Sequence, residues 1–368
     1  MNIREFKLFN FDDDFAIILN SALKEDKNIY IPSGTYIVKS TIYLPSDVTI
    51  TADKDAYIKC ANHCFDRKGD TPFVMNDDKV NGNKNIKISG GIWDCNSIYN
   101  DKIHYKEGPA TGLGFCLDKV DNLVIENLTI KNSNTYNFRL CEVTNFVMHD
   151  ITFAGEYQTI CQDGIHIGGG SKHGHIYNIK CEGINTNDDL IAINADEAMK
   201  YCQNIGYKEG DISDILVENV SAENCWSVIR LLSIRYKIEN IIFRNFKCGF
   251  REIGLNLDGT RYAGDKLFKD EDYPEGIGNL NNILFEDFTL WHVRNFRPVC
   301  VLETNAHNLV IRNFKRDISR EGDNDLKTIV VKHLGKGTIL TTPKGKVELD
   351  MSKTFECDCS EISEFRIN

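Results

Sequence analysis

The chain of 368 residues lacks three features that would place it in a common class. No window approaches eighteen consecutive apolar residues, so no segment is predicted to span a membrane. An excess of positive charge is also missing. The net charge is −11 and the isoelectric point is about 5.4, which disfavours a nucleic acid or an anionic membrane as a partner. Residues 1–20 have no basic start followed by an apolar stretch, so no signal peptide is visible.

The thirteen cysteines do not form a disulfide framework in the sequence. Their number is odd, and they spread from Cys60 to Cys359, whereas disulfide scaffolds are short and cysteine-dense. The segment CANHC at 60–64 has no second Cys/His pair at zinc spacing nearby, so we predict neither a structural metal nor a cofactor. We therefore expect reduced thiols and a cytoplasmic location, or a secreted protein if a leader has been removed.

The most regular feature of the sequence is a repeated phrase: Asn or Asp, apolar, any, apolar, any, Asn or Asp, apolar. Copies include NLVIENL at 122–128, DILVENV at 214–220 and NIIFRNF at 240–246. The second Asn or Asp of each copy serves as a marker of the repeat. The markers are Asn127, Asp150, Asn178, Asn219, Asn245, Asp287 and Asn313. Their spacing gives a unit of about 23–28 residues, with two longer gaps that leave room for loops.

Strands of period two with a turn at a fixed phase are typical of a stacked-strand solenoid. Three short strands fit one coil of this period. Asn and Asp tolerate left-handed backbone angles, so each marker is predicted to lie at a turn, and stacked Asn side chains can form a ladder along the axis. A leucine-rich repeat is disfavoured because it needs Leu at fixed points and a helix in each unit. The predicted fold is all-β.

The two ends of the chain differ from the middle. Residues 11–24 alternate as an amphipathic helix with Ile17, Ile18, Ala22 and Leu23 on or near one face. Such a helix would cover the open N-terminal end of a solenoid. We expect a single domain made of an N-terminal cap with the first strands, a body of coils and a C-terminal cap, at residues 1–50, 51–316 and 317–368.

Two acidic motifs carry the chemistry. Asp163 lies in QDGIHI, and Asp188 and Asp189 lie in NDDLIAIN twenty-five residues later. Each motif interrupts an alternating apolar pattern, so each is predicted on or beside a short strand. If the chain coils once between them, the three carboxylates share one patch. Hydrolysis of a glycosidic bond needs one proton donor and one base to activate water, and this patch can supply both.

With these motifs the chain resembles right-handed parallel β-helix proteins of the pectin-degrading group. The likeness is greatest to polygalacturonase-like enzymes of glycoside hydrolase family 28. QDGIHI resembles their Asn-Thr-Asp-Gly motif, and NDDLIAIN resembles their paired-Asp motif. The segments 29–50 and GGIWDCN at 90–96 resemble their opening coils, and the likeness covers roughly residues 10–315.

The resemblance implies a single-stranded right-handed parallel β-helix and an inverting glycoside hydrolase for a pectin-like or related poly- or oligosaccharide. It assigns Asp188 as the general acid, and Asp163 and Asp189 as the groups that position and activate water. One carboxylic acid must keep its proton near neutral pH, which close like charges favour. The acid and base of an inverting pair stand roughly 6.5–9.5 Å apart.

The sequence departs from this family at the positions that contact substrate. The Gly-His-Gly motif corresponds to CWSVIRLLS at 225–233, where Arg230 is the polar residue, and no Arg-x-Lys motif is found. His166 stands where an Asp is usual. We predict that His166, Arg230 and Trp226 bind substrate, and that Arg251 and Arg235 are candidates for a substrate anion. These departures favour a sugar other than galacturonate.

Other interpretations remain open at this point. Any single Asp can cap a turn, and Arg230 can pair with a structural carboxylate. A polysaccharide lyase would hold Ca²⁺ with several acids and place Arg230 near the substrate α-proton. A non-catalytic carbohydrate binder or phage-type spike can keep the same scaffold, because fold does not fix function. Side-by-side packing into a homo-oligomer is also compatible with a solenoid.

Overall fold

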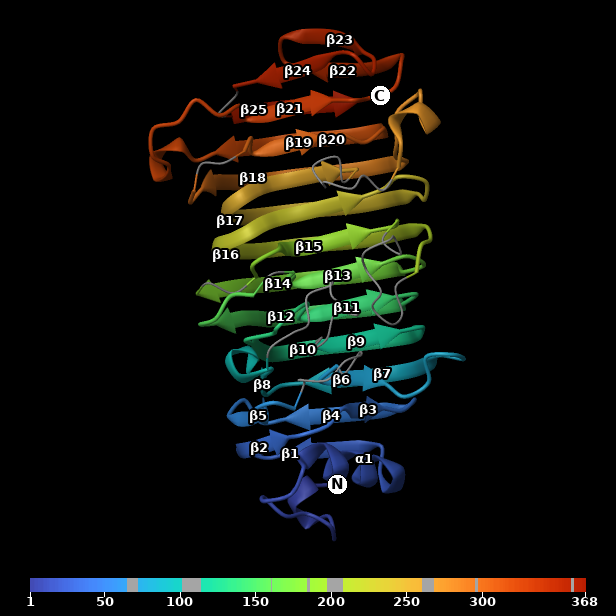
Figure 1. Ribbon diagram of the computed structural model, residues 1–368, viewed down its shortest axis with the longest axis vertical. Helices are drawn as coiled ribbons and strands as arrows, with labels where there is room; N and C mark the ends of the chain where they lie inside the picture. The colour runs from blue at the N-terminus through green and yellow to red at the C-terminus, as the bar shows by residue number, and fades with distance from the viewer. Residues whose placement is uncertain are drawn as a thin grey trace.

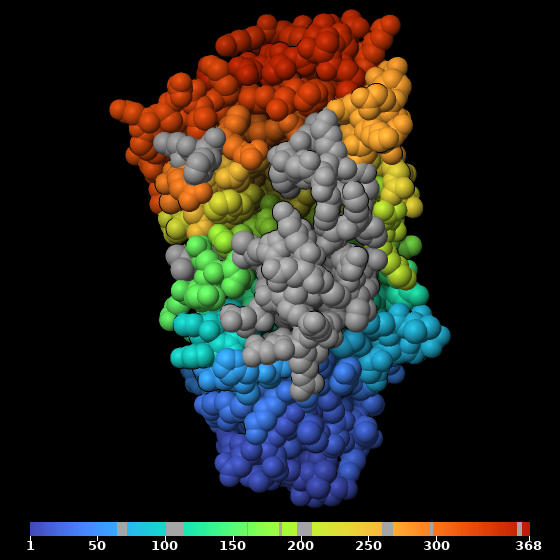
Figure 2. All heavy atoms as spheres, viewed as in Figure 1, coloured from blue at the N-terminus to red at the C-terminus, as the bar shows by residue number. Residues whose placement is uncertain are grey.

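The protein forms an elongated stack of β-coils along one axis, with a helix at the N-terminal end and antiparallel strands at the C-terminal end (Figure 1). Figure 2 shows the same stack as a space-filling body that runs from the N-terminal cap to the C-terminal strands. This right-handed parallel β-helix confirms the predicted fold. The structure is a computed structural model and describes residues 1–64, 72–100, 114–159, 161–183, 186–196, 208–259, 268–294, 297–358 and 361–368.

Three columns of parallel strands run along the axis. The first column contains β1 (Asn28–Ile31), β4 (Val48–Ala52), β7 (Asn83–Ser89) and the first parts of β10 (Val120–Lys131), β12 (Thr144–Gly155), β14 (Lys172–Gly183), β16 (Ile212–Leu232), β17 (Ile238–Asp258), β18 (Leu280–His292) and β20 (Ala306–Arg316). The second column contains β2 (Gly34–Val38), β5 (Ala56–Cys60), β8 (Ile92–Asp94), the later parts of β10, β12, β14, β18 and β20, and the middle parts of β16 and β17.

The third column carries the acidic motifs. It contains β3 (Ile42–Leu44), β6 (Val74–Asn76), β9 (Phe115–Asp118), β11 (Phe138–Cys141), β13 (Ile165–Gly168), β15 (Asp189–Asn194), the ends of β16 and β17, β19 (Cys300–Leu302) and β21 (Ile329–Lys332). Each strand of this column pairs with the strand one coil away, so residues in register form straight rows along the axis.

The marker residues turn the chain between the first and second columns. All seven have left-handed φ angles of 51° to 61°, which confirms the predicted turns. Their side chains form the predicted ladder: Asn178 Nδ2 donates to Asp150 Oδ1 at 3.0 Å, and Asn245 Nδ2 donates to Asn219 Oδ1 at 2.7 Å. These amides satisfy one another along the axis at a corner where the strand bends.

A second ladder is formed by the first Asn or Asp of each copy, a position at which no turn was predicted. Asn240 Nδ2 donates to Asp214 Oδ1 at 2.8 Å, and Asn282 Nδ2 donates to Asn240 Oδ1 at 3.0 Å. These residues also have left-handed φ angles. Each repeat therefore has two Asn corners on either side of one short strand, and the phrase encodes both.

Apolar residues fill the interior of the coils in stacked rows. Phe243 and Phe285 stack with ring centroids 5.0 Å apart, and Phe246 and Phe288 stack at 4.6 Å. Their strands alternate buried and partly exposed residues, as period two requires. The core is thus one continuous column of side chains, and each coil contacts mainly its two neighbours.

The N-terminal helix α1 (Phe15–Glu25) covers the first coils, as predicted, but it begins at Phe15 rather than at residue 11. Asp14 is the N-cap, and its carboxylate accepts the N–H of Ala16. Ile17 is 61% exposed, contrary to the predicted face. The buried positions of this helix are Phe15, Ala16, Ile18, Leu19, Ala22 and Leu23. A rotation of about 100° per residue places Ile17 opposite most of them.

The C-terminal end is closed by antiparallel strands. β24 (Thr354–Cys357) pairs with β21, and β25 (Glu361–Ile367) pairs with β20. β22 (Thr338–Thr342) and β23 (Gly345–Leu349) form a hairpin, and β22 also pairs with β25. These strands cover the last open edges of the stack, which would otherwise pair with another chain. Within the described segments, four short 3-10 helices lie in connections: η1 (Ile3–Glu5), η2 (Ser97–Tyr99), η3 (Asp270–Asp272) and η4 (Ile318–Arg320).

The eleven cysteines in the described part of the chain are thiols, and most of them are buried. Burial raises the pKa of Cys181 to about 11 and that of Cys141 to about 12, so these thiols are inert packing groups. Among the described residues, no helix is both long and apolar enough to cross a bilayer.

Candidate active site

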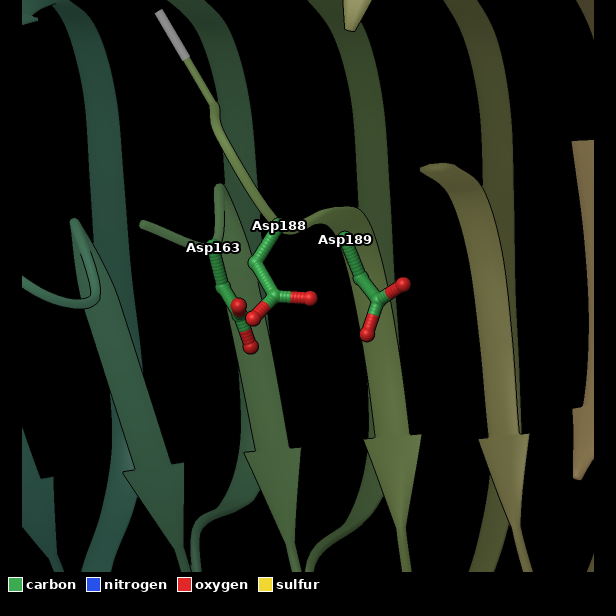
Figure 3. A group of neighbouring side chains, drawn as sticks. All are labelled: Asp163, Asp188 and Asp189. Atoms are coloured by element: carbon green, nitrogen blue, oxygen red, sulfur yellow. The ribbon is translucent and has the colours of Figure 1, made fainter. Parts of the chain in front are cut away.

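The three predicted catalytic acids meet on the third column. Asp189 begins β15, Asp188 precedes it, and Asp163 lies two residues before β13. Ile165 pairs with Ile191, so Asp163 and Asp189 occupy equivalent positions on adjacent coils. One carboxylate oxygen from each acid lies within 4.8 Å of the others. Figure 3 shows the carboxyl groups of Asp163 and Asp188 side by side, with Asp189 next to them on the following coil.

The nearest oxygens of the three acids lie within 4.8 Å of one another, whereas 6.5–9.5 Å is the separation of the two whole carboxyl groups of an inverting pair. The short contacts arise because Asp163 and Asp189 stack on neighbouring strands, which lie about 4.8 Å apart. A single water can still bridge two such oxygens through hydrogen bonds of about 2.8 Å. The arrangement can therefore hold a water against two carboxylates, with the third acid beside it.

Asp189 is only 3% exposed, as is Asp163. Burial raises its pKa well above the usual carboxyl range, and the negative charge of Asp188 raises it further. Asp163 and Asp258 act in the same direction, while the Arg230 guanidinium opposes them. The site thus retains a proton at a pH where an ordinary carboxyl has lost it, which acid catalysis requires.

His166 contacts the acid cluster directly. Its Nδ1 lies 2.5 Å from Asp163 Oδ2, and both side chains are buried. The ring of Tyr136 packs on His166 with centroids 4.4 Å apart. In a regular strand, Asp163 and His166 would point to opposite faces because they are three residues apart. Asp163 precedes β13, however, so its side chain does not follow the alternation of that strand. His166 is therefore placed to orient the Asp163 carboxylate.

Arg230 stands one coil beyond β15 and contacts two acids. Its Nε donates to Asp258 Oδ2 at 3.0 Å, and its Nη1 lies 3.8 Å from Asp189 Oδ2. Arg230 thus contacts both a structural carboxylate, as considered from the sequence, and the acid cluster. Asp258 is fully buried and was missed in the sequence. The signal was its position: it lies 28 residues after Arg230, which is one coil, on the adjoining strand.

Arg251 lies behind the acid cluster and holds the segment that leads into it. The side chain is 8% exposed, and its Nη2 donates to Thr186 O at 3.2 Å and to Asn187 Oδ1 at 3.3 Å. Thr186 has a left-handed φ of 57°, which is strained for a β-branched residue. The backbone N–H of Trp226 also donates to Thr186 O, at 3.1 Å. These two bonds hold the strained residue that fixes the direction of Asp188.

Trp226 is half-buried, and its ring contacts cations. The guanidinium carbons of Arg251 and Arg294 lie 5.5 and 5.3 Å from the ring centroid. Cation–π contacts of this kind stabilise the local packing. The structure therefore gives Trp226 and Arg251 defined structural contacts, and their predicted contacts with substrate stay predictions.

Arg235 is not part of the cluster. It follows β16 and lies eight residues after Ser227, the residue that pairs with Asp189. Its guanidinium pairs with Asp196 at 3.3 Å and Glu209 at 2.5 Å. Asp196 is buried, and its Oδ2 accepts three successive backbone N–H groups from residues 234–236. Arg235 thus helps to fix a turn at the far end of the strand.

The three acids can also be tested as cation ligands. Their oxygens are close enough together to contact one ion, but Ca²⁺ takes six to eight oxygens at about 2.3–2.6 Å. The acids would supply three of these, and water, substrate or other protein oxygens would have to supply the rest. Hydrolysis by the same acids requires no such additional ligands.

A family model matches the chain over residues 24–229, which is more than half of its length. This model describes glycosyl hydrolases family 28. The chain belongs to this family. The matched region contains both acidic motifs and ends one residue before Arg230, in the coil where the Gly-His-Gly motif is missing. No curated protein matches the sequence of this family 28 chain.

Solved structures with the same fold have low sequence identity to this chain. Family 28 exopolygalacturonase from Yersinia enterocolitica has a TM-score of 0.60 at 15% identity, over 90% of this chain and 67% of that chain. Endo-xylogalacturonan hydrolase from Aspergillus tubingensis has a TM-score of 0.57 at 14% identity, over 89% and 86%. PfbA, a surface adhesin of Streptococcus pneumoniae, has a TM-score of 0.57 at 12% identity, over 96% and 98%. At these identities the likeness establishes the fold alone.

Proposed function

We propose that this protein is a glycoside hydrolase that cleaves a glycosidic bond of a poly- or oligosaccharide with inversion at the anomeric carbon. The observation that carries the proposal is the stack of Asp163, Asp188 and Asp189, with a raised pKa at Asp189, in a chain of family 28. The family supports hydrolysis. The stack supports a mechanism in which a proton donor and a water-activating base stand next to each other.

Each acid has a distinct role in this mechanism. Asp188 is the least buried of the three and donates a proton to the departing sugar oxygen. Asp163, oriented by His166, takes the proton of the attacking water, and Asp189, whose raised pKa favours its protonated form, helps to hold that water. Because their oxygens lie within 4.8 Å, the proton can return from base to acid through a single water after each turnover.

The substrate is proposed to differ from plain polygalacturonate. No Arg-x-Lys motif is present, and the nearest arginine, Arg251, donates its hydrogen bonds to Thr186 and Asn187 instead. Arg230, in the place of the missing His, is paired with Asp258. The cations beside the acids therefore already have carboxylate or backbone partners, which favours a sugar that is recognised through its hydroxyl groups.

The test is an activity screen on neutral and uronic oligosaccharides with the wild type, Asp188→Asn and Asp287→Asn. Asp287 is a marker residue, and Asn occupies the same corner in five other copies, so Asp287→Asn is a matched control for the chemical change. We expect new reducing ends with the wild type and the control, and none with Asp188→Asn. Turnover that survives Asp188→Asn would contradict the assignment.

A lyase is the second candidate, because three acidic oxygens within 4.8 Å can contact a cation beside Arg230. The same screen separates it from the hydrolase. A lyase would release an unsaturated product that absorbs in the ultraviolet and would lose activity with a Ca²⁺ chelator. Binding without turnover of any substrate would instead favour a non-catalytic carbohydrate binder.

A further inference from the structure

A cavity of about 340 Å³ opens on the third column beyond the acid cluster, toward the C-terminal end. Asn256, Val301 and Val330 line it from three consecutive coils, and Arg297, Glu303 and Lys332 line it as well. Its size falls in the range of small-molecule sites. No step of the proposed hydrolysis uses these residues.

The row of Asp189 leads into the cavity, because Asp189 pairs with Ser227, and Ser227 pairs with Ile253, which lines the cavity. A parallel row starts at Ala192, three residues after Asp189. Ala192 of β15 pairs with Arg230, Arg230 with Asn256, Asn256 with Val301, and Val301 with Val330. These five residues form one straight row across five coils. At about 4.8 Å per coil, Asn256 lies roughly 10 Å and Val330 roughly 19 Å from Ala192. A sugar chain that runs along this row advances by about one ring per coil.

Polar contacts connect the cavity to the acids. Asn256 Nδ2 lies 3.5 Å from Asp258 Oδ2, the oxygen that also accepts Arg230 Nε. Arg230 in turn lies beside Asp189. The wall of the cavity and the acid cluster are therefore joined by one network of polar contacts that passes through the buried Asp258.

The chemistry of the cavity suits a neutral ring. Val301 and Val330 are 9% and 8% exposed and offer an apolar floor for the C–H face of a pyranose. The two cations on the rim each pair with a carboxylate: Arg297 Nε lies 2.5 Å from Glu252, and Lys332 Nζ lies 2.9 Å from Glu303. Fixed donors and acceptors with balanced charge recognise hydroxyl groups, whereas a uronic carboxylate would have to compete with Glu252 and Glu303.

We propose that this cavity is a distal subsite that binds a neutral pyranose ring of the same oligosaccharide, two to four coils from Asp189 toward the C-terminal end. This inference rests on the proposed function. It implies that the substrate extends several rings from the scissile bond in this direction, and that short oligosaccharides leave part of the available binding energy unused.

The test fills the cavity with Val330→Trp and uses Val80→Trp as a matched control, because Val80 is 78% exposed in a distant turn. The probes are two ladders of two to seven units, linear xylo-oligosaccharides and oligogalacturonides. We expect Val330→Trp to lower kcat/KM for the longest neutral substrate about tenfold more than for the disaccharide, a loss of about 1.4 kcal/mol. Val80→Trp should leave the ratio unchanged. An equal effect of Val330→Trp on long and short substrates would overturn the subsite.

Binding measurements separate a failed subsite from a failed hydrolase. The same ladders are titrated into Asp188→Asn with and without Val330→Trp. If no variant turns over sugar but Val330→Trp still weakens binding of long neutral probes, the subsite stands and hydrolysis falls. Tighter binding of the uronic ladder would overturn the neutral class. Failure of both ladders to bind at millimolar concentration would overturn the subsite altogether.

Discussion

The coils that contain β13 and β15 differ from the coils that follow them. The first two carry Asp163, Asp188 and Asp189 in motifs that resemble those of family 28, and the family match covers them. The next two, at the ends of β16 and β17, carry Arg230 and the buried Asp258 as an ion pair. The acid cluster therefore stands beside coils of different composition.

The difference follows from what each region has to do. Three acids on adjacent strands are held at the spacing of the β-helix, so the scaffold itself sets the catalytic geometry. The residue type at a position that contacts substrate has no such constraint and can differ between proteins that act on different sugars. The same fold can thus keep its reaction while its specificity changes.

Among the substitutions that test this comparison, Asp189→Asn should have the largest effect on activity. The amide cannot hold or take a proton, so we expect kcat to fall by about 10³-fold.

Because the raised pKa of Asp189 favours its protonated form, the folded wild type loses stability as pH rises from the usual carboxyl range through that raised pKa. The Asn variant cannot ionise, so its thermal stability should exceed that of the wild type increasingly as pH rises. Equal pH dependence of the two melting temperatures would contradict the burial argument.

The second effect concerns the Arg230 and Asp258 pair. Arg230→Met leaves a fully buried carboxylate without its cation, so we expect a loss of about 3–5 kcal/mol in the free energy of unfolding. Arg366→Met, which breaks an exposed pair with Glu364, should cost less than about 1 kcal/mol. Denaturant unfolding measures both. Similar losses in the two variants would show that burial does not distinguish these pairs.

A smaller effect is expected where Arg251 supports the acids from behind. Arg251→Met removes two hydrogen bonds from the Thr186 segment, so Asp188 should lose its orientation, with kcat down about tenfold and KM little changed. Arg294→Met is the control, because this arginine also lies over the Trp226 ring. Thr186→Asn, which suits the left-handed angle, should restore part of the activity in the Arg251→Met background. A rise in KM with unchanged kcat would instead indicate that Arg251 binds substrate.

The smallest effect should come from the corners of the scaffold. Asn245→Ala places a residue with a Cβ and no local hydrogen bond at a φ of 56°, which costs about 1–2 kcal/mol. Asn245→Asp should cost less, because Asp occupies the same corner at Asp150 and Asp287. Both variants should keep full activity below their melting temperatures. Lost activity in a folded Asn245→Ala protein would mean that the corners also shape the site.

The sequence predicts those features that depend on one repeat and its neighbour. The marker turns, the Asn ladder and the meeting of Asp163 with Asp188 and Asp189 all follow from the period of the coil. It does not predict contacts that depend on how side chains are oriented in one particular coil. The Asp258 partner of Arg230 is an example, because Asp258 pairs in register with Leu232 rather than with Arg230, and only the side-chain orientations bring the two charged groups together.

Other differences have similarly local causes. Ile17 is exposed because the rotation of about 100° per residue places it opposite most of the buried residues of the helix. The spacing of the acids is set by the distance between strands, whereas the motifs alone imply only that they are near each other.

The most direct test of the central claim is hydrolysis in water enriched in oxygen-18, with the products followed by mass spectrometry and proton NMR. If the stacked acids activate water, the new reducing end carries one oxygen-18, its first-formed anomer is inverted, and Asp188→Asn yields no labelled product. An unsaturated product without label, or labelled product at the wild-type rate from Asp188→Asn, would contradict the account.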